Sequence, residues 1–173
     1  MLSEKIEKAF NDQLNAEYYS AYLYFSMAAY FDDLQLPGFA HWLKIQGMEE
    51  KTHALRFYNQ IYERGGKVTL AAIAAPPTAW DSPLACFEDV LAHEIKVTGL
   101  INNLVALARQ ENDYASENFL QWFISEQVEE EASATEVIGK LKLISQDMRG
   151  SGLLMLNQEM SARVFVMPPT LTF

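Results

Sequence analysis

The placement of proline limits how this chain can fold, because a proline interrupts a helix. The six prolines all lie outside four long segments, which span residues 2–33, 38–64, 84–110 and 113–145. Along each segment apolar residues recur at steps of three and four, the spacing of an α-helix with one buried face. A shorter segment of the same kind follows at about 153–163. The sequence therefore predicts an all-α fold with four long helices and a short fifth helix.

The connections between these segments predict how the helices run. The breaks near 34–37 and 111–112 are short, so we expect two antiparallel hairpins. The link at 65–83 holds three prolines and two glycines, which favours an extended chain. Its 19 residues reach roughly 60 Å when extended, more than the length of a long helix. We therefore expect a four-helix bundle with one long crossover over residues 1–145, and a short fifth helix and tail of the same domain over 146–173.

Each apolar stripe is interrupted by polar residues near its middle. The interruptions, in chain order, are Glu17, Glu50, His53, Glu94, Gln127 and Glu130. The separation from Glu17 to Glu50 is 33 residues, and so is the separation from Glu94 to Gln127. Counting from the two hairpin turns places all six side chains at one height. The chain thus reads as two related hairpins that share one divided site.

Four glutamates at one level of a bundle core require compensation. Burying an unpaired charge costs several kcal/mol, whereas two divalent cations would offset four negative charges. Carboxylate oxygens with a single imidazole suit iron or manganese, with zinc as a competitor. The spacing therefore predicts a buried two-metal site.

Charge and cysteine content exclude several other classes of function. Thirteen Lys and Arg against 23 Asp and Glu give a net charge of −10 without a basic cluster, which argues against binding nucleic acid or an anionic membrane. The one cysteine, Cys86, excludes an intrachain disulfide framework and indicates a reducing compartment. We find no apolar core of a signal peptide and no stretch of about 18 apolar residues. We therefore expect a soluble cytoplasmic protein.

The motifs around the polar layer resemble those of a known family. They are Ala16-Glu17-Tyr18, the run from Met48 to His53, His93-Glu94 and the run from Glu126 to Glu131. Together they are similar to the four helical motifs of the ferritin family, of the non-haem bacterial and archaeal type. The resemblance covers essentially the whole chain, including the short fifth helix. It implies a ferritin-like bundle that stores iron and has ferroxidase activity.

The resemblance also implies a ligand set. Glu17, Glu50 and His53 would hold the first iron, with Glu50 bridging to a second iron held by Glu94 and Glu130. Gln127 stands in the place of a carboxylate and would contribute hydrogen bonds or weak contact. Because the second motif has Glu130 where the first has histidine, the second site should bind iron more weakly.

Further residues resemble accessory parts of the same centre. Glu49, Glu126 and Glu129 are similar to the carboxylates that form a third iron site in bacterial ferritins. Tyr24 resembles the tyrosine beside the first iron, and Trp122 is a second candidate for supplying an electron.

The reaction that the resemblance implies is oxidation of Fe(II) by O2 or H2O2, followed by storage of the mineral in a hollow shell of 24 subunits. The apolar run Leu153–Leu156 could pack around a symmetry axis of such a shell. Haem is not expected, because Lys51 and Thr52 follow Glu50 where bacterioferritin would place a methionine ligand beside that motif. The alternatives are a rubrerythrin-like di-iron peroxidase, which would want a second Glu-x-x-His and a cysteine-rich module, and a DNA-protecting mini-ferritin, whose metals lie between subunits.

Overall fold

The computed structural model describes residues 1–144 and 151–167, which form five helices. They are α1 (Glu4–Asp33), α2 (Pro37–Glu63), α3 (Pro83–Gln110), α4 (Tyr114–Ile144) and α5 (Ser151–Met160). The predicted all-α fold is confirmed, and each helix boundary lies within three residues of its predicted position. The predicted division at residue 145 and the end of the tail at 168–173 lie outside the described residues.

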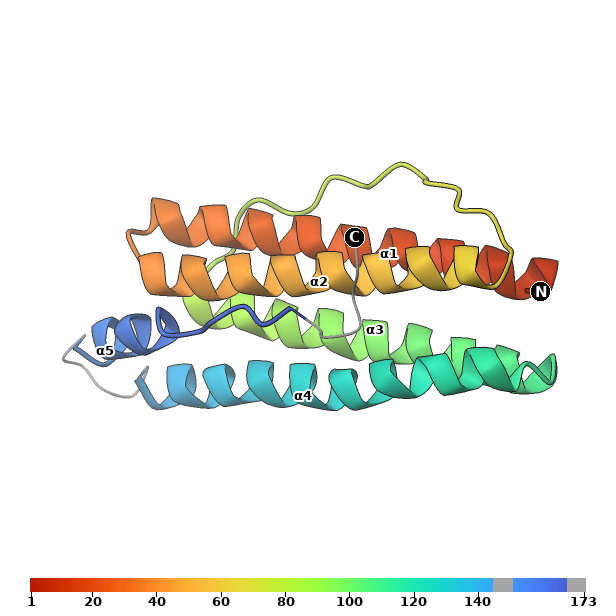
Figure 1. The fold of residues 1–173 in the computed structure, drawn as a ribbon. Helices are drawn as coiled ribbons and strands as arrows, with labels where there is room; N and C mark the ends of the chain where they lie inside the picture. The colour runs from red at the N-terminus through yellow and green to blue at the C-terminus, as the bar shows by residue number, and fades with distance from the viewer. Residues whose placement is uncertain (145–150, 168–173) are drawn as a thin grey trace.

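The helices form two antiparallel hairpins, α1 with α2 and α3 with α4 (Figure 1). The segment between α2 and α3 runs back along the outside of the bundle as an extended chain, so that α2 and α3 point the same way (Figure 1). The predicted long crossover is thus confirmed. It allows the two hairpins to face each other with their polar interruptions at the same height.

Local sequence signals account for where the helices begin and end. Ser82 caps α3, its side chain accepting a hydrogen bond from the backbone N–H of Ala85 at 3.0 Å. Pro83 occupies the first turn, where a missing N–H costs nothing. The hairpin turns contain Gln35 and Asn112 with φ of 58° and 55°, and Gly65 ends α2 with φ of 73°. The left-handed residues Gln35 and Asn112 reverse the chain and close the hairpins, whereas Gly65 leads into the long crossover.

Two apolar clusters fill the bundle, one on each side of its middle. The first packs aromatic residues from three helices, including Phe31, Phe39 and Phe87. The second joins Phe10, Phe57 and Phe123 with aliphatic residues of α1 to α4. The polar layer predicted from the sequence lies between these clusters, so apolar packing closes it off at both ends.

Helix α3 is more apolar than the sequence analysis allowed. Within the described residues it is the one helix whose length and composition would suffice for a membrane span. The core helix of a soluble bundle can have the same length and composition. The buried carboxylate of Glu94 and the packing of α3 against α4 identify α3 as a bundle helix.

Helix α5 packs across one end of α2 and also contacts α4. Residue Leu36, before α2, makes no side-chain capping bond. Asn157 of α5 supplies this cap, its Oδ1 accepting from the backbone N–H of Gly38 at 2.8 Å and of Phe39 at 3.3 Å. Of the apolar run at 153–156, Leu156 is buried within the subunit, whereas Leu154 and Met155 are exposed.

Candidate metal centre

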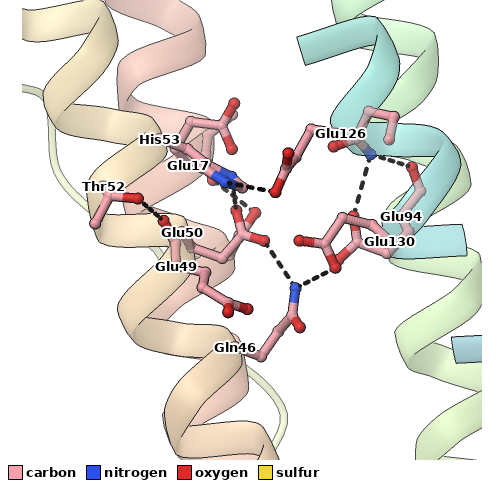
Figure 2. Close-up of polar contacts among 12 residues, drawn as sticks. Glu17, Gln46, Glu49, Glu50, Thr52, His53, Glu94, Glu126 and Glu130 are labelled. Carbon is pink, nitrogen blue, oxygen red and sulfur yellow. Dashed lines mark hydrogen bonds and ion pairs between the residues drawn. The ribbon is translucent and has the colours of Figure 1, made fainter. Parts of the chain in front are cut away.

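The structure brings all six predicted interruptions into one buried layer at mid-bundle. Each of their side chains is almost completely inaccessible, from 1% exposed for Glu17 and Glu94 to 6% for Glu130. The first hairpin supplies Glu17 from α1 and both Glu50 and His53 from α2, while α3 and α4 supply the others (Figure 2). The counting of residues from the turns therefore located the layer correctly.

The first hairpin contributes a compact group of possible metal ligands. One ligand atom from each of Glu17, Glu50 and His53 lies within 4.8 Å of the others. His53 Nδ1 is 3.3 Å from Glu50 Oε2, and Gln13 Nε2 donates to Glu17 Oε1 at 2.9 Å. Glu17 Oε2 is buried without a hydrogen-bond partner. A buried carboxylate oxygen in this state is costly unless a cation sits beside it.

The second hairpin offers carboxylates that the protein already holds in place. Glu94 Oε1 accepts a hydrogen bond from the hydroxyl of Tyr24, and Glu94 Oε2 accepts one from Gln127 Nε2 at 3.2 Å. Glu130 Oε2 accepts from Gln46 Nε2 at 2.6 Å, and the same nitrogen donates to Glu50 Oε1 at 3.4 Å (Figure 2). Gln46 therefore links the two half-sites across the bundle.

Burial dominates the electrostatics of the layer. It raises the pKa of Glu17 and Glu94, raises that of Glu50 well above its ordinary value, and raises the pKa of Glu130 to about 8. Burial alone would lower the pKa of His53, but the Glu50 and Glu126 carboxylates hold it well above its usual range. The metal-free layer therefore retains protons that a bound cation would displace.

The three accessory carboxylates have different surroundings. Glu126 Oε1 lies 3.8 Å from His53 Nε2. Glu126, His53 and Glu130 also form a second group of three possible ligands, with one ligand atom of each within 4.8 Å of the others. Glu49 forms an ion pair with Arg163 instead. Glu129 is exposed. Of these three, only Glu126 enters a ligand group among the described residues.

The aromatic candidates lie on either side of the layer. Tyr24 is fully buried, and burial together with the Glu94 carboxylate raises its pKa well above the ordinary value. The ring of Trp122 lies 5.3 Å from that of His53, and the guanidinium of Arg56 lies 3.9 Å above the indole. Tyr24 therefore contacts a buried carboxylate of the layer, and Trp122 contacts its imidazole.

Sequence reasoning did not assign a role to several residues that orient the layer. Gln13 and Gln46 each precede a glutamate of the layer by four residues on the same helix face, and that spacing could have signalled them. Thr98 accepts from Gln127 Nε2 at 3.3 Å and donates to Glu131 Oε1 at 2.5 Å. These contacts keep the amide nitrogen of Gln127 directed at Glu94.

A bundle with one long crossover and a buried layer of carboxylates around one imidazole is typical of the bundle proteins that bind metal ions through carboxylates. Glu17 Oε2 is free to bind a cation, and the possible ligands, carboxylate oxygens with one imidazole, suit iron. Residues 7–144 match the family profile of the ferritin-like domain. The chain belongs to the ferritin family, whose members bind and store iron.

Individual relatives agree with this assignment. The chain is 44% identical over 142 residues to a bacterial non-heme ferritin of Bacteroides fragilis, covering 82% of this chain and 89% of the relative. It is 41% identical over 165 residues to a bacterial non-heme ferritin of Staphylococcus aureus, covering 95% and 98%.

Solved structures of an archaeal ferritin are also similar. A closed form of the Archaeoglobus fulgidus ferritin, engineered by site-directed mutagenesis, superposes with a TM-score of 0.94 at 52% identity, covering 96% of this chain and all of that one. An open-pore ferritin of the same archaeon gives 0.92 at 51% identity, covering 95% of this chain and 100% of that one. The similarity therefore extends over nearly the entire fold.

Proposed function

We propose that this chain oxidises Fe(II) to Fe(III) at a two-iron centre inside each subunit and stores the product in a hollow shell of 24 subunits in the cytoplasm. The observation that carries the proposal is the buried layer, whose four carboxylates exceed what its own histidine can neutralise. Residues 1–145 would form the bundle with this centre, and 146–173 the fifth helix and tail. Substrate iron would supply the missing positive charge.

The proposed ligands divide between the hairpins. Glu17, Glu50 and His53 would hold one Fe(II), and Glu94 with Glu130 would hold the other. Glu50 is the proposed bridge, because its carboxylate contacts both His53 and the Gln46 amide that reaches Glu130. Two neutral amides, Gln13 and Gln127, would keep the outer carboxylates in position without adding charge.

The chemistry balances with two iron ions per event. Each Fe(II) gives up one electron, and O2 takes both electrons and two protons to become H2O2; H2O2 as oxidant takes them to become two H2O. The protein would contribute charge compensation through its carboxylates, and proximity because both ions would lie in one layer. The Tyr24 hydroxyl holds Glu94, and we propose that Tyr24, with Trp122 as a second candidate, can supply an additional electron.

The accessory carboxylates would act after the first oxidation. Glu126 is the best placed of them, since it approaches His53 from α4. We propose that Glu126 with Glu49 and Glu129 forms a third iron site beside the pair. The alternatives of a peroxidase and a DNA-protecting mini-ferritin lack the support that the non-heme ferritin relatives lend to storage.

One pair of variants tests the centre. Glu50→Ala should abolish the fast oxidation phase, because the substitution removes the proposed bridge from both irons. Glu129→Ala is the matched control on an exposed carboxylate and should leave the first turnover nearly intact. Stopped-flow absorbance with simultaneous oxygen uptake measures both variants under one protocol. If Glu129→Ala destroys the first turnover while Glu50→Ala spares it, the centre has been assigned to the wrong carboxylates.

A second measurement tests the shell. Light scattering on the purified protein at physiological salt should report a large closed assembly, because exposed Leu154 and Met155 on α5 offer an apolar surface for packing between subunits. A stable monomer or dimer would contradict this part of the proposal.

A further inference from the structure

Arg163, three residues beyond α5, fastens the tail to α2 through three contacts. Its guanidinium forms an ion pair with the carboxylate of Glu49 and lies over the indole of Trp42, 4.1 Å from the ring centre. Its backbone carbonyl accepts a hydrogen bond from His41 Nε2 at 2.8 Å. Side chain and backbone are thus both held, so the position of the charge is defined.

This charge is held against α2 and acts on two carboxylates at the metal centre. Burial raises the pKa of Glu49, and Arg163 is the strongest of the groups that oppose the rise. Arg163 also opposes, as the smallest of several influences, the rise in the pKa of Glu130, a residue of α4. The tail leaves α5, which packs against both α2 and α4, and runs back along α2, where it contacts His41, Trp42 and Glu49 (Figure 1). A single guanidinium therefore acts on carboxylates of both helices.

The position of Arg163 coincides with part of the proposed third site. That site needs Glu49 as a ligand, yet Glu49 already has a positive partner from its own chain. A divalent cation arriving beside a fixed guanidinium meets like-charge repulsion and finds a carboxylate oxygen already engaged. Arg163 and the third metal ion therefore compete for the same negative charge.

The ion pair between Arg163 and Glu49 can also separate more readily than a fully buried pair. Arg163 Nη1 is buried and has no hydrogen-bond partner, so the guanidinium is not fully satisfied where it lies. The side chains of Arg163 and Glu49 are 20% and 21% exposed, so water can reach both when they separate. Releasing the pair therefore costs less than breaking a fully buried ion pair.

We propose that Arg163 is a tethered counter-ion for the third metal site, and that this site takes a divalent cation only when the tail releases Glu49. The inference rests on the proposed function, and within it on the third iron site that has Glu49 as a ligand. Arg163 then sets how many ions a subunit holds at once: two bound tightly, and a third only after the tail has moved.

Calorimetric titration of the metal-free assembled protein with Zn(II), which cannot be oxidised, tests the competition. Arg163→Gln should tighten the third ion by about tenfold or more, since removing one positive charge beside a divalent ion is worth at least that factor. It should change the first two ions much less, because Arg163 contacts Glu49 directly and is the smallest of the influences on Glu130. Arg163→Lys retains the charge without the planar fork and should keep the third site weak. Arg109→Gln removes an arginine from an exposed ion pair elsewhere and serves as the matched control.

A second measurement follows the tail in the unmodified protein. The backbone N–H groups of Ala162 and Arg163 donate to carbonyls of α5, so they should resist hydrogen exchange while the tail is docked. With two Zn(II) per subunit this protection should persist, and with excess Zn(II) it should fall. Mass spectrometry of the segment that contains these amides detects the change without any variant.

The outcomes distinguish a failure of the Arg163 inference from a failure of the proposed two-iron centre. If Arg163→Gln binds the third ion no more tightly than the unmodified protein, or if excess Zn(II) leaves the tail protected, Arg163 is not a competitor and the inference is overturned. Failure of the unmodified protein to bind the first two ions would instead overturn the proposed centre. Tight binding of two ions that is lost in Glu50→Ala supports the centre whatever Arg163 does.

Discussion

Replacing Glu130 with glutamine should stabilise the metal-free protein, although it removes a proposed iron ligand. Burial and the neighbouring Glu94 carboxylate raise the pKa of Glu130 to about 8, against an ordinary value of 4.5. At neutral pH the folded chain must therefore keep a proton on Glu130 that the unfolded chain gives up. Glutamine fills the same space, carries no charge, and can still accept the hydrogen bond from Gln46 through its carbonyl oxygen.

The size of the effect follows from the shift in pKa. Holding a proton about 2.5 pH units above the unfolded pKa costs about 3 kcal/mol at pH 7. Because the pKa of Glu130 is higher in the folded than in the unfolded chain, Glu130 destabilises the folded state only above about pH 4.5. The loss of stability grows up to about pH 8 and is constant at higher pH. For a chain of this size, 3 kcal/mol corresponds to a rise in melting temperature of roughly 6–12 °C.

Differential scanning calorimetry of the metal-free assembly, at one scan rate and at pH 4.5 and 8, measures the effect. We expect Glu130→Gln to melt at the temperature of the unmodified protein at pH 4.5 and several degrees above it at pH 8. Glu129→Gln makes the same change one residue away on the exposed face of α4 and should have little effect at either pH. Equal shifts in both variants, or a gain that does not depend on pH, would refute the electrostatic reasoning.

Three further predictions follow from contacts around the layer and at the end of the bundle. Adding Zn(II) to the metal-free protein should raise its melting temperature and release protons, which titrations in buffers of different ionisation enthalpy detect. Gly38→Ala should detach α5, seen as faster hydrogen exchange, because the new Cβ would lie 1.6 Å from the carbonyl oxygen of Asn157, whereas Gly99→Ala meets nothing within 4 Å and should be neutral or stabilising. Thr98→Val should slow the initial oxidation a few-fold by freeing the Gln127 amide, and Thr98→Ser should restore the rate.

The fold was predictable because its determinants are local. Proline positions and short breaks specified the hairpins, and one long link specified the parallel crossover. The height of the polar layer also followed, since two helices that leave one tight turn rise at the same rate per residue. Glu17 and Glu50 could therefore be matched across the first hairpin by counting alone.

The remaining contacts depend on how the two hairpins and α5 rotate and dock against one another. The spacing of apolar residues along the sequence does not specify these arrangements. The bond from Gln46 to Glu130 joins residues 84 positions apart in different hairpins. The pairing of Arg163 with Glu49 spans 114 positions and requires α5 to be seated first. The accessory glutamates Glu49, Glu126 and Glu129 illustrate the same limit. Each is next in sequence to a residue of the buried layer, so its side chain points about 100° away from the buried stripe of its helix. Its partners therefore depend on which element packs against that side of the helix.

The division of the centre between two hairpins has a consequence for the order in which the chain folds. Each hairpin is made of contacts close in sequence, which form early, whereas docking the hairpins closes the long crossover loop and comes later. Docking is also the step that brings Glu17 and Glu50 against Glu94 and Glu130. Mutual repulsion of these carboxylates therefore opposes the last stage of folding and leaves the first untouched, so acidity and metal ions should govern how fast the two halves join without changing how fast each half forms.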